Sequence, residues 1–185
     1  MNILLWVIVA VIAFAVIIVV YYYNRFTKLS NRIDNSLSQI DVQLKRRADL
    51  IPNLIESVKG YMKHEKAAIK AVTDARTVMM GAKDLPGKVK ANNVLEGALK
   101  TIFALAENYP DLKANTNFLE LQRELASTED RVAYSRQFYN DSILEYENKR
   151  KTFPGNFFAN TFGFKEKEYI KIAEAERKVV KVDFE

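Results

Sequence analysis

The chain has 185 residues, which is enough for one domain with its own hydrophobic core besides a membrane segment. Its 28 Lys and Arg and 23 Asp and Glu residues give a net charge of +5, and this modest, dispersed excess lacks the basic stripe that nucleic-acid binding needs. The chain contains no cysteine, which excludes thiol catalysis and a lipid anchor on a thiol but does not indicate the cellular compartment.

The first element of the chain is an uninterrupted apolar run. It begins at Ile3 and ends at Val20, and the first charged residue of the chain is Arg25. Together with the three tyrosines that follow it, the run reaches the length of about 20 residues that a helix needs to cross a bilayer. The run therefore predicts a transmembrane helix.

A cleavable signal peptide is the alternative reading of this segment. It would have a basic region before a shorter apolar core and a small-x-small cleavage site at its end. Here only two uncharged residues precede the run, and the one small-x-small triplet, at residues 13–15, lies in its middle. Trp6 at one end and Tyr23 at the other are placed like the aromatic belts of the two membrane interfaces. We therefore predict a permanent anchor over residues 1–23.

Basic residues follow the span directly. Arg25, Lys28 and Arg32 stand close to its end, against a single acidic residue, Asp34. Lys and Arg near a span favour the cytoplasmic side of the membrane, and they are also placed to attract anionic lipid. This predicts a single-pass protein of the cell membrane, with its N-terminus outside and a cytoplasmic body over residues 24–185.

The body shows helical periodicity. From Leu29 to Met80 the apolar residues recur at steps of three and four, which predicts one helix of about 50 residues that continues the span without a break. Pro52 lies inside it, and because the apolar stripe resumes in phase after the proline, we expect a kink at Pro52 and not an end. The alternative is that Pro52 occupies an exposed, tolerant face.

Two further stripes predict a helix at about 88–108 and another from Asn117 to about Lys151, started by a capping box of Asn117 and Glu120. Strand-like alternation occurs only at residues 179–184, where it is weak. The predicted fold class is all-α, with a single N-terminal transmembrane helix that continues into a bundle of about four long antiparallel helices.

No catalytic or metal-binding pattern is found. The single histidine, His64, is flanked by charged residues and is expected to be a solvated surface residue. The sequence has no E-x-x-H motif and no glycine-rich phosphate loop, so we expect neither a metal nor a cofactor. The basic triplet at residues 45–47 could contact lipid headgroups, but pairing with acidic residues of a neighbouring helix is the preferred interpretation.

Two loops are candidate interaction surfaces. One contains Tyr109, Pro110, Asp111 and Lys113, for which the alternative is a plain turn between helices. The other holds five phenylalanines within twelve residues, from Phe153 to Phe164. This second loop either folds back onto an end of the bundle or leaves an exposed apolar patch that marks a partner or membrane site. The candidate contact residues there are Phe157, Phe158, Phe162 and Phe164.

Several separate blocks resemble the LemA family. The longest is SQIDVQLKRRADLIPNLIESVKGYMKHE at residues 38–65, followed by YPDLKAN at 109–115, NFLELQ at 117–122, TEDR at 128–131, YN at 139–140, FPGN at 153–156 and FGF at 162–164. Leu37 and Met62 depart from the family pattern, where tryptophan and alanine are usual, but both remain apolar. The resemblance implies a membrane-anchored helical bundle without an established activity, and its genomic company implies a link to membrane proteolysis or envelope stress.

These observations leave three hypotheses for the function. The first is a membrane-anchored, non-enzymatic adaptor that binds an unknown protein in the membrane or the cytoplasm. The second is a structural spacer that self-associates into a homo-oligomer at the membrane. The third is an enzyme of unrecognised chemistry, which the absence of a catalytic residue set in the sequence disfavours. In every case the lipid bilayer is a partner and nucleic acid is not.

Overall fold

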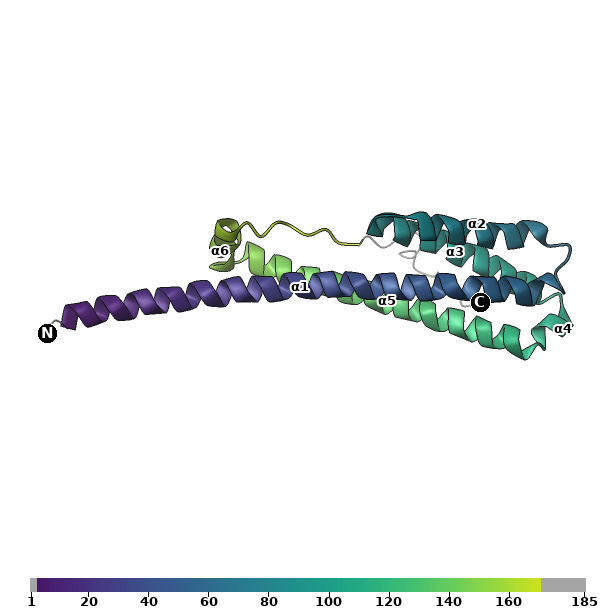
Figure 1. Cartoon of the computed structure of the whole chain (residues 1–185), viewed down its shortest axis with the longest axis horizontal. Coiled ribbons are helices and arrows are strands. Elements are labelled where there is room, and N and C mark those ends of the chain that lie inside the picture. The colour runs from purple at the N-terminus through teal and green to yellow at the C-terminus, as the bar shows by residue number, and fades with distance from the viewer. Residues whose placement is uncertain (1–2, 171–185) are drawn as a thin grey trace, which may run out of the picture. The chain divides into compact units, whose positions relative to one another are not determined.

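A computed structural model describes residues 3–170, of which about 85% are helical, with no strand among them. Six helices are found in this range (Figure 1): α1 (Ile3–Lys59), α2 (Lys66–Gly81), α3 (Leu85–Ala106), α4 (Pro110–Lys113), α5 (Thr116–Lys151) and α6 (Gly155–Phe162). The predicted all-α fold class is confirmed. The weak strand pattern at residues 179–184 lies outside the described residues.

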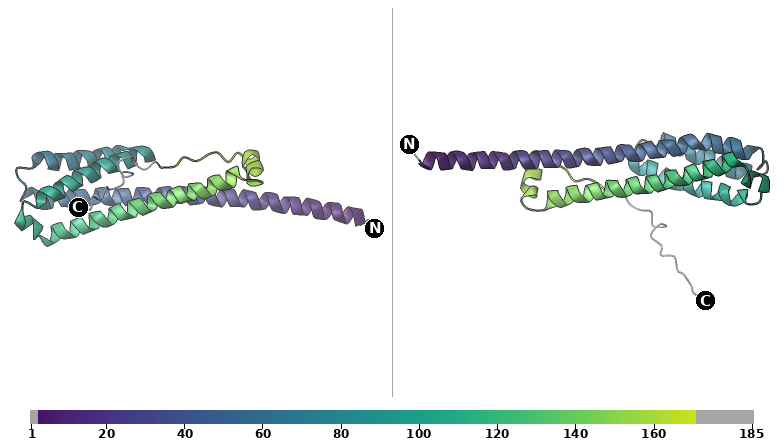
Figure 2. Two further views of the ribbon diagram at one scale, coloured as in Figure 1. Left: turned by 180° about the vertical axis from the view of Figure 1, so that it is seen from behind. Right: turned by 90° about the horizontal axis from the view of Figure 1, so that it is seen from below.

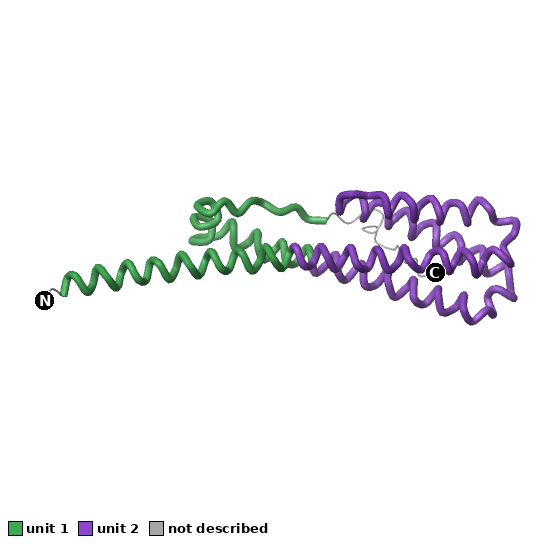
Figure 3. The backbone as a smooth tube through the Cα atoms, in the orientation of Figure 1, with its two compact units in different colours: residues 1–33, 139–185 green, residues 34–138 purple. Residues whose placement is uncertain are grey.

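The chain divides into two compact units (Figure 3). Unit 1 comprises residues 1–33 and 139–185, and unit 2 comprises residues 34–138. Helices α1 and α5 each contribute residues to both units. The division into an anchor at residues 1–23 and a cytoplasmic body at 24–185 concerns the surroundings of the chain and stays a prediction.

Unit 2 is a helical bundle whose core consists of the predicted apolar stripes. Within it, α2 and α3 lie side by side, as the views in Figures 1 and 2 agree. A hydrogen bond of 2.8 Å from Arg76 Nε of α2 to the carbonyl oxygen of Ala48 joins α2 to α1. The buried core residues include Ile40, Leu44, Ile51 and Leu54 of α1, Val72 and Met79 of α2, Leu95, Leu99 and Ile102 of α3, and Leu125 and Val132 of α5.

The prediction of one helix from Leu29 to Met80 is wrong, because α1 ends at Lys59 and α2 begins at Lys66. The amides of Tyr61 and Met62 both donate to the carbonyl oxygen of Val58, at 3.1 and 2.9 Å, and close the end of α1. Met62 is fully buried in the turn. The spacing of apolar residues therefore continues through this turn, although the helix ends before it.

The starts of α3 and α5 also differ from the prediction. Pro86 lies in the first turn of α3, where its missing N–H would have had no helical partner, so α3 begins at Leu85 and not near residue 88. At α5 the N-cap is Asn115, whose Oδ1 accepts a hydrogen bond of 3.1 Å from the amide of Phe118. The capping box predicted at Asn117 is therefore wrong by two residues.

Unit 1 contains residues 3–33 of α1, residues 139–151 of α5, helix α6 and the non-helical segment 163–170. Gly163 ends α6 with φ of 72°, a left-handed conformation that favours glycine. The amide of Phe164 then donates to the carbonyl oxygen of Ala159 at 2.9 Å. This closure directs the chain away from α6 and into the segment 163–170.

Pro52 lies inside α1, so the prediction that the helix continues past it is confirmed, whereas the kink stays a prediction. Pro52 itself is exposed, while Ile51, Leu54 and Ile55 beside it are buried in unit 2. We expect Pro52→Ala to leave the melting temperature nearly unchanged or lower, because neighbours packed against a bent helix lose contacts when it straightens. Circular dichroism melts of the two proteins test this. A rise of more than 10 °C, as the helix-propensity difference of about 3 kcal/mol alone would give, contradicts the kink and supports a tolerant face.

Candidate functional site

Groups suited to metal binding are not brought together in the described part of the chain. Among residues 3–170 no cluster of three or more His, Asp or Glu residues could hold a metal ion. His64 is exposed, as expected, although it lies in the turn between α1 and α2 and not on a helix.

The predicted membrane span is the largest exposed apolar surface of unit 1. All of its side chains lie along one helix, and none of the residues in its most apolar window is buried inside the protein. The exposed fraction is 83% at Ile3, 63% at Trp6 and 50% at Val20. Because no other part of the described chain covers this surface, it needs an apolar environment from outside the protein.

The basic residues after the span share an acidic partner that sequence reasoning missed. Glu145 of α5 pairs with Arg25 through one carboxylate oxygen and with Arg32 Nη1 through the other, at 2.7 Å for Arg32. Lys28 is exposed. Two of the three predicted lipid-proximal residues, Arg25 and Arg32, are therefore joined by one carboxylate. The carboxylate of Glu145 offsets part of their charge.

An aromatic cluster joins α6 to the end of the span. We define it as Tyr22, Tyr23, Phe26, Phe158, Phe162 and Phe164. The rings of Tyr22 and Phe158 stack with centroids 4.6 Å apart, and those of Phe26 and Phe164 stack at 4.9 Å. Tyr23 meets Phe162 edge to face at 5.3 Å. Three of the four candidate phenylalanines thus fold back onto α1.

Two phenylalanines stay outside this cluster. Phe153, in the turn before α6, is 87% exposed, and Phe157, on α6, is 63% exposed, whereas Phe158 is only 8% exposed. The loop therefore folds back through some of its phenylalanines and leaves others exposed, and a partner or membrane site at the exposed ones stays a prediction. The loop packs onto unit 1 through one face and presents an apolar patch with the other.

A row of α5 side chains holds the segment 163–170 by its backbone. The Asn140 amide group both donates to the carbonyl oxygen of Ile170 at 3.1 Å and accepts from its amide at 3.0 Å. The Tyr146 hydroxyl donates to the carbonyl oxygen of Lys165 at 2.7 Å, and Glu147 Oε1 accepts from the amide of Lys167 at 3.0 Å. Next to Asn140, the Tyr139 hydroxyl donates to the carbonyl oxygen of Glu168 at 3.2 Å. Asn140, Tyr146 and Glu147 thus form a main-chain clamp.

Glu147 is the buried charge of this clamp. Burial acts to raise the pKa of its carboxyl group, but hydrogen bonds from Arg150 and from the amide of Lys167 outweigh burial, so the pKa lies below the ordinary value of 4.5. A carboxyl group whose pKa is depressed by folding stabilises the fold above its unfolded pKa. That contribution is lost as the pH falls through the folded pKa.

We expect the clamp to loosen in acid for this reason. Amide exchange at Lys167, corrected for the intrinsic rate, should lose protection as the pH falls below about 4.5. In Glu147→Gln this protection should already be weak at neutral pH and should no longer depend on pH. Glu166→Gln, which changes an exposed carboxylate near the same arginine, serves as the control and should behave like the unchanged protein. Equal pH profiles for all three would contradict the assignment.

Unit 2 buries one arginine. Arg47 is 1% exposed, and its guanidinium donates to Asn92 at 3.1 Å and to Glu129 at 3.4 Å. Its neighbour Arg46 is exposed and pairs with Glu124 at 2.8 Å. The preferred interpretation of the basic triplet, pairing with acidic residues of another helix, is therefore confirmed for both arginines.

Two carboxyl groups beside Arg47 have pKa values pushed in opposite directions. Burial and the neighbouring Glu96 raise the pKa of Glu129. Burial also acts to raise the pKa of Glu96, but the hydrogen bond and charge of Lys100, 2.5 Å away, outweigh it and lower that pKa. Burial lowers the pKa of Arg47 in spite of both carboxylates. Opposed values can mark an acid and base pair, yet here the charges compensate one another, as in a structural polar core.

The loop at Tyr109–Lys113 closes one end of unit 2. Its residues form the short helix α4, in which Leu112 is fully buried. The Tyr109 hydroxyl donates to Glu65 at 3.4 Å, and Asn115 donates to the Tyr61 hydroxyl at the same distance. These contacts join α4 to the turn between α1 and α2, as a plain helix connection would. Whether Tyr109, Pro110, Asp111 and Lys113 bind a partner stays a prediction.

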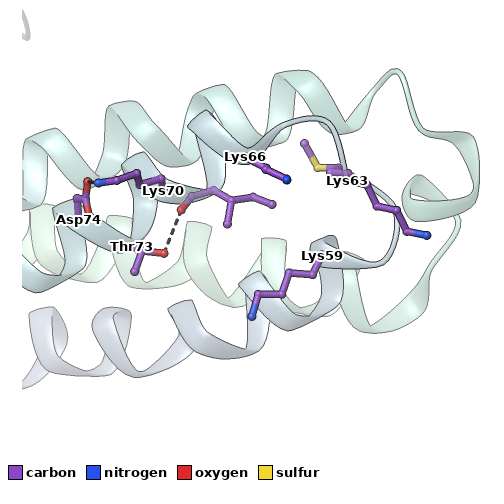
Figure 4. Close-up of a pocket in the computed structure, with 8 residues that line it drawn as sticks. Lys59, Lys63, Lys66, Lys70, Thr73 and Asp74 are labelled. Carbon is purple, nitrogen blue, oxygen red and sulfur yellow. Dashed lines mark hydrogen bonds and ion pairs between the residues drawn. The ribbon is translucent and has the colours of Figure 1, made fainter.

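A surface pocket of unit 2 lies beside the same turn (Figure 4). It measures about 520 Å³ and is lined by Lys59, Lys63, Lys66 and Lys70, together with Met62, Ile69, Thr73 and Asp74. Lys70 pairs with Asp74 at 2.5 Å, and the side chains of Lys59 and Lys63 point away from each other. The lysines therefore do not converge on one point, as they would in an anion site.

Comparison with known proteins identifies relatives over most of the chain. A model of the LemA family matches residues 36–184. Protein LemA of Metamycoplasma hominis is 27% identical over 158 residues, which cover 83% of this chain and 71% of that protein. Magnetosome protein MamQ 2 of Paramagnetospirillum magneticum is 25% identical over 175 residues, and magnetosome protein MamQ of Magnetospirillum gryphiswaldense is 24% identical over 173. Both matches cover 80% of this chain and 64% of the MamQ protein, so the chain spans less than two thirds of their length. None of these names denotes an enzyme.

Proposed function

The chain belongs to the LemA family, and from this membership we propose that it is a membrane-anchored adaptor without catalytic activity of its own. Residues 3–20 hold it in the bilayer, and the helices of unit 2 present surface to a protein partner in the membrane or the cytoplasm. The process served would be membrane proteolysis or envelope stress, as the resemblance to the family implies. Confinement to the membrane would restrict the search for the partner to two dimensions.

The exposed apolar run of α1 is the observation that carries this proposal. Fourteen of its eighteen residues are Leu, Ile, Val or Phe, each favouring insertion by roughly 0.3–0.6 kcal/mol, which sums to about 4–8 kcal/mol at most. No charged residue opposes this sum, and the fold offers the run no core to enter. The N-terminal helix therefore fits a single-pass membrane protein.

Exposed apolar side chains on unit 2 support a protein partner. Val78 and Met80 of α2, Val94 of α3 and Tyr134 of α5 are all about half exposed or more. Methionine and tyrosine are enriched in protein interfaces. These residues mark the surfaces on which a partner is to be sought.

Site-specific photo-crosslinking in native membranes tests the adaptor. A photoreactive residue in place of Val78, Val94 or Tyr134 should give an adduct with a protein of different mass, while one in place of the exposed Lys63 should not. Adducts with twice the mass of the chain alone would support the alternative, a self-associating spacer. No adduct at any of the three positions would overturn the adaptor.

The orientation is proposed to place the body in the cytoplasm. Glu145 neutralises part of the charge of Arg25 and Arg32, but acidic residues contribute little to the orientation of a span, so the basic residues still decide it. We expect a reporter fused after Glu185 to be active in the cytoplasm, and protease added outside intact cells to leave the body undigested. Digestion of the body from outside would reverse the proposed topology.

A further inference from the structure

Helix α6 packs against the part of α1 that follows the apolar run. Tyr22 and Tyr23 come directly after the apolar run, which places them at the depth of the membrane interface. The stacking of Phe158 on Tyr22 and the contact of Phe162 with Tyr23 hold α6 beside these tyrosines. Helix α6 therefore lies at the interface whenever residues 3–20 cross the bilayer.

The composition of this segment suits the interface. Residues 152–164 contain no charged side chain, although more than a quarter of the chain is charged. Basic residues flank the segment on both sides, with Lys149, Arg150 and Lys151 before it and Lys165 after it. Uncharged aromatic residues between basic ones are the pattern of a segment whose rings enter the acyl boundary while the lysines reach the headgroups.

One face of α6 is buried, and the other is exposed. Gly155, Phe158 and Ala159 are buried against unit 1, so they cannot reach lipid. Phe153 and Phe157 have no such cover and are 87% and 63% exposed, more than any other described phenylalanine outside the apolar run. On the buried side, Lys149 Nζ lies 4.7 Å from the centre of the Tyr22 ring, which places its charge near the headgroup level.

We propose that α6 is an interfacial membrane contact, with Phe153 and Phe157 inserted at the boundary of headgroups and acyl chains. The occupant of this apolar patch is the phospholipid bilayer that α1 crosses, because the patch lies at the depth of the tyrosines that end the span. The inference rests on the proposed membrane span. It goes beyond that span because α6 would give the chain a second contact with the bilayer. This second contact would fix the rotation of α1 about its own axis, which a single spanning helix leaves free.

Depth measurement on single-cysteine variants tests the inference. The chain has no cysteine, so Phe153→Cys and Phe157→Cys can each be labelled uniquely with a fluorophore and reconstituted as full chains in vesicles containing phosphatidylglycerol. Quenching by a doxyl group near the headgroup end of the acyl chain is compared with quenching by iodide in water. Both labels should be quenched several-fold more by the shallow doxyl lipid than by iodide.

Two reference positions make the outcome decisive. Tyr134→Cys, 70% exposed in unit 2, carries the same apolar label and should be quenched by iodide alone. Ile12→Cys, in the middle of the apolar run, should be quenched by a deep doxyl group. Iodide quenching at Phe153 and Phe157 equal to that at Tyr134, with Ile12 in lipid, would overturn the interfacial contact and leave the span intact.

Two other outcomes also count against the proposal. Failure of the lipid quencher at Ile12 would remove the span on which the inference rests. Shielding of Phe153 and Phe157 from both quenchers would mean that protein covers the patch, as in a pair of chains. The interfacial contact is therefore supported only by lipid quenching at Phe153 and Phe157 together with lipid quenching at Ile12.

Discussion

Replacing Arg47 by methionine is expected to lower the free energy of unfolding of unit 2 by about 3 kcal/mol, since it removes a buried guanidinium and both of its hydrogen bonds, one to the buried Asn92 and one to the half-exposed Glu129. The substitution leaves the buried Asn92 side chain without the donor that its Oδ1 accepts from. It also leaves Glu96 and Glu129 beside each other with Lys100 as their only compensating cation among the groups described above. For a unit of this size, the melting temperature should fall by more than 10 °C.

Arg46→Met is the matched control for this prediction. Arg46 is the preceding residue of the same helix and also pairs with a glutamate, but the pair is exposed, so its loss should cost less than about 1 kcal/mol. Urea unfolding of the full chains in detergent micelles, followed by circular dichroism, gives both values. Equal losses for the two variants would show that burial of Arg47 contributes nothing to stability.

Gly155→Ala is expected to release α6 from unit 1. A Cβ atom at Gly155 would come within 2.1 Å of the carbonyl oxygen of Lys149 and 3.2 Å of its carbonyl carbon. Both atoms belong to the backbone, so no side-chain rotation relieves the overlap, and the cost should reach or exceed the ~3 kcal/mol of a severe overpacking. Because α6 is short, it should detach locally while the rest of unit 1 stays folded.

Exposure of Phe158 reports this release. In Gly155→Ala the amides of α6 should exchange at nearly unprotected rates, and a protease that cuts after phenylalanine should cleave within residues 153–164. Gly97→Ala, at an exposed position in α3 with no atom within 4 Å of the added Cβ, is the control and should gain about 0.5–1 kcal/mol from helix propensity. Unchanged protection of α6 in Gly155→Ala would contradict the close approach.

The sequence predicts the span and the helices well because both depend on periodic or continuous apolar residues. The end of α5 at Lys151 and the helical nature of α1 past Pro52 follow from the stripe alone. The turn at residues 60–65 was missed because Met62 keeps the period while the backbone turns. Gly60, which weakens a helix, was the available signal for a break there.

The polar network of unit 2 could have been partly foreseen. Arg47 lies three residues after Leu44 and four before Ile51, on the apolar stripe, whereas Arg46 does not. This spacing therefore predicts that Arg47 is buried. Its partners Asn92 and Glu129 come from other helices, and no local pattern indicates which acidic residue a buried arginine will meet. The contacts of Glu145 and of the main-chain clamp were missed for the same reason.

The clamp on α5 has a consequence for how the chain can change over evolutionary time. Within residues 165–170 the clamp forms its hydrogen bonds only with backbone amide and carbonyl groups, through Asn140, Tyr146 and Glu147. Every residue except proline has both of these groups. Side chains at Lys165 and Glu168 are exposed and unconstrained by this recognition, whereas Glu166 pairs with Arg150 and Lys151 of α5. The segment can therefore accept new charges, or new chemical groups on its side chains, while its path along α5 stays where it is.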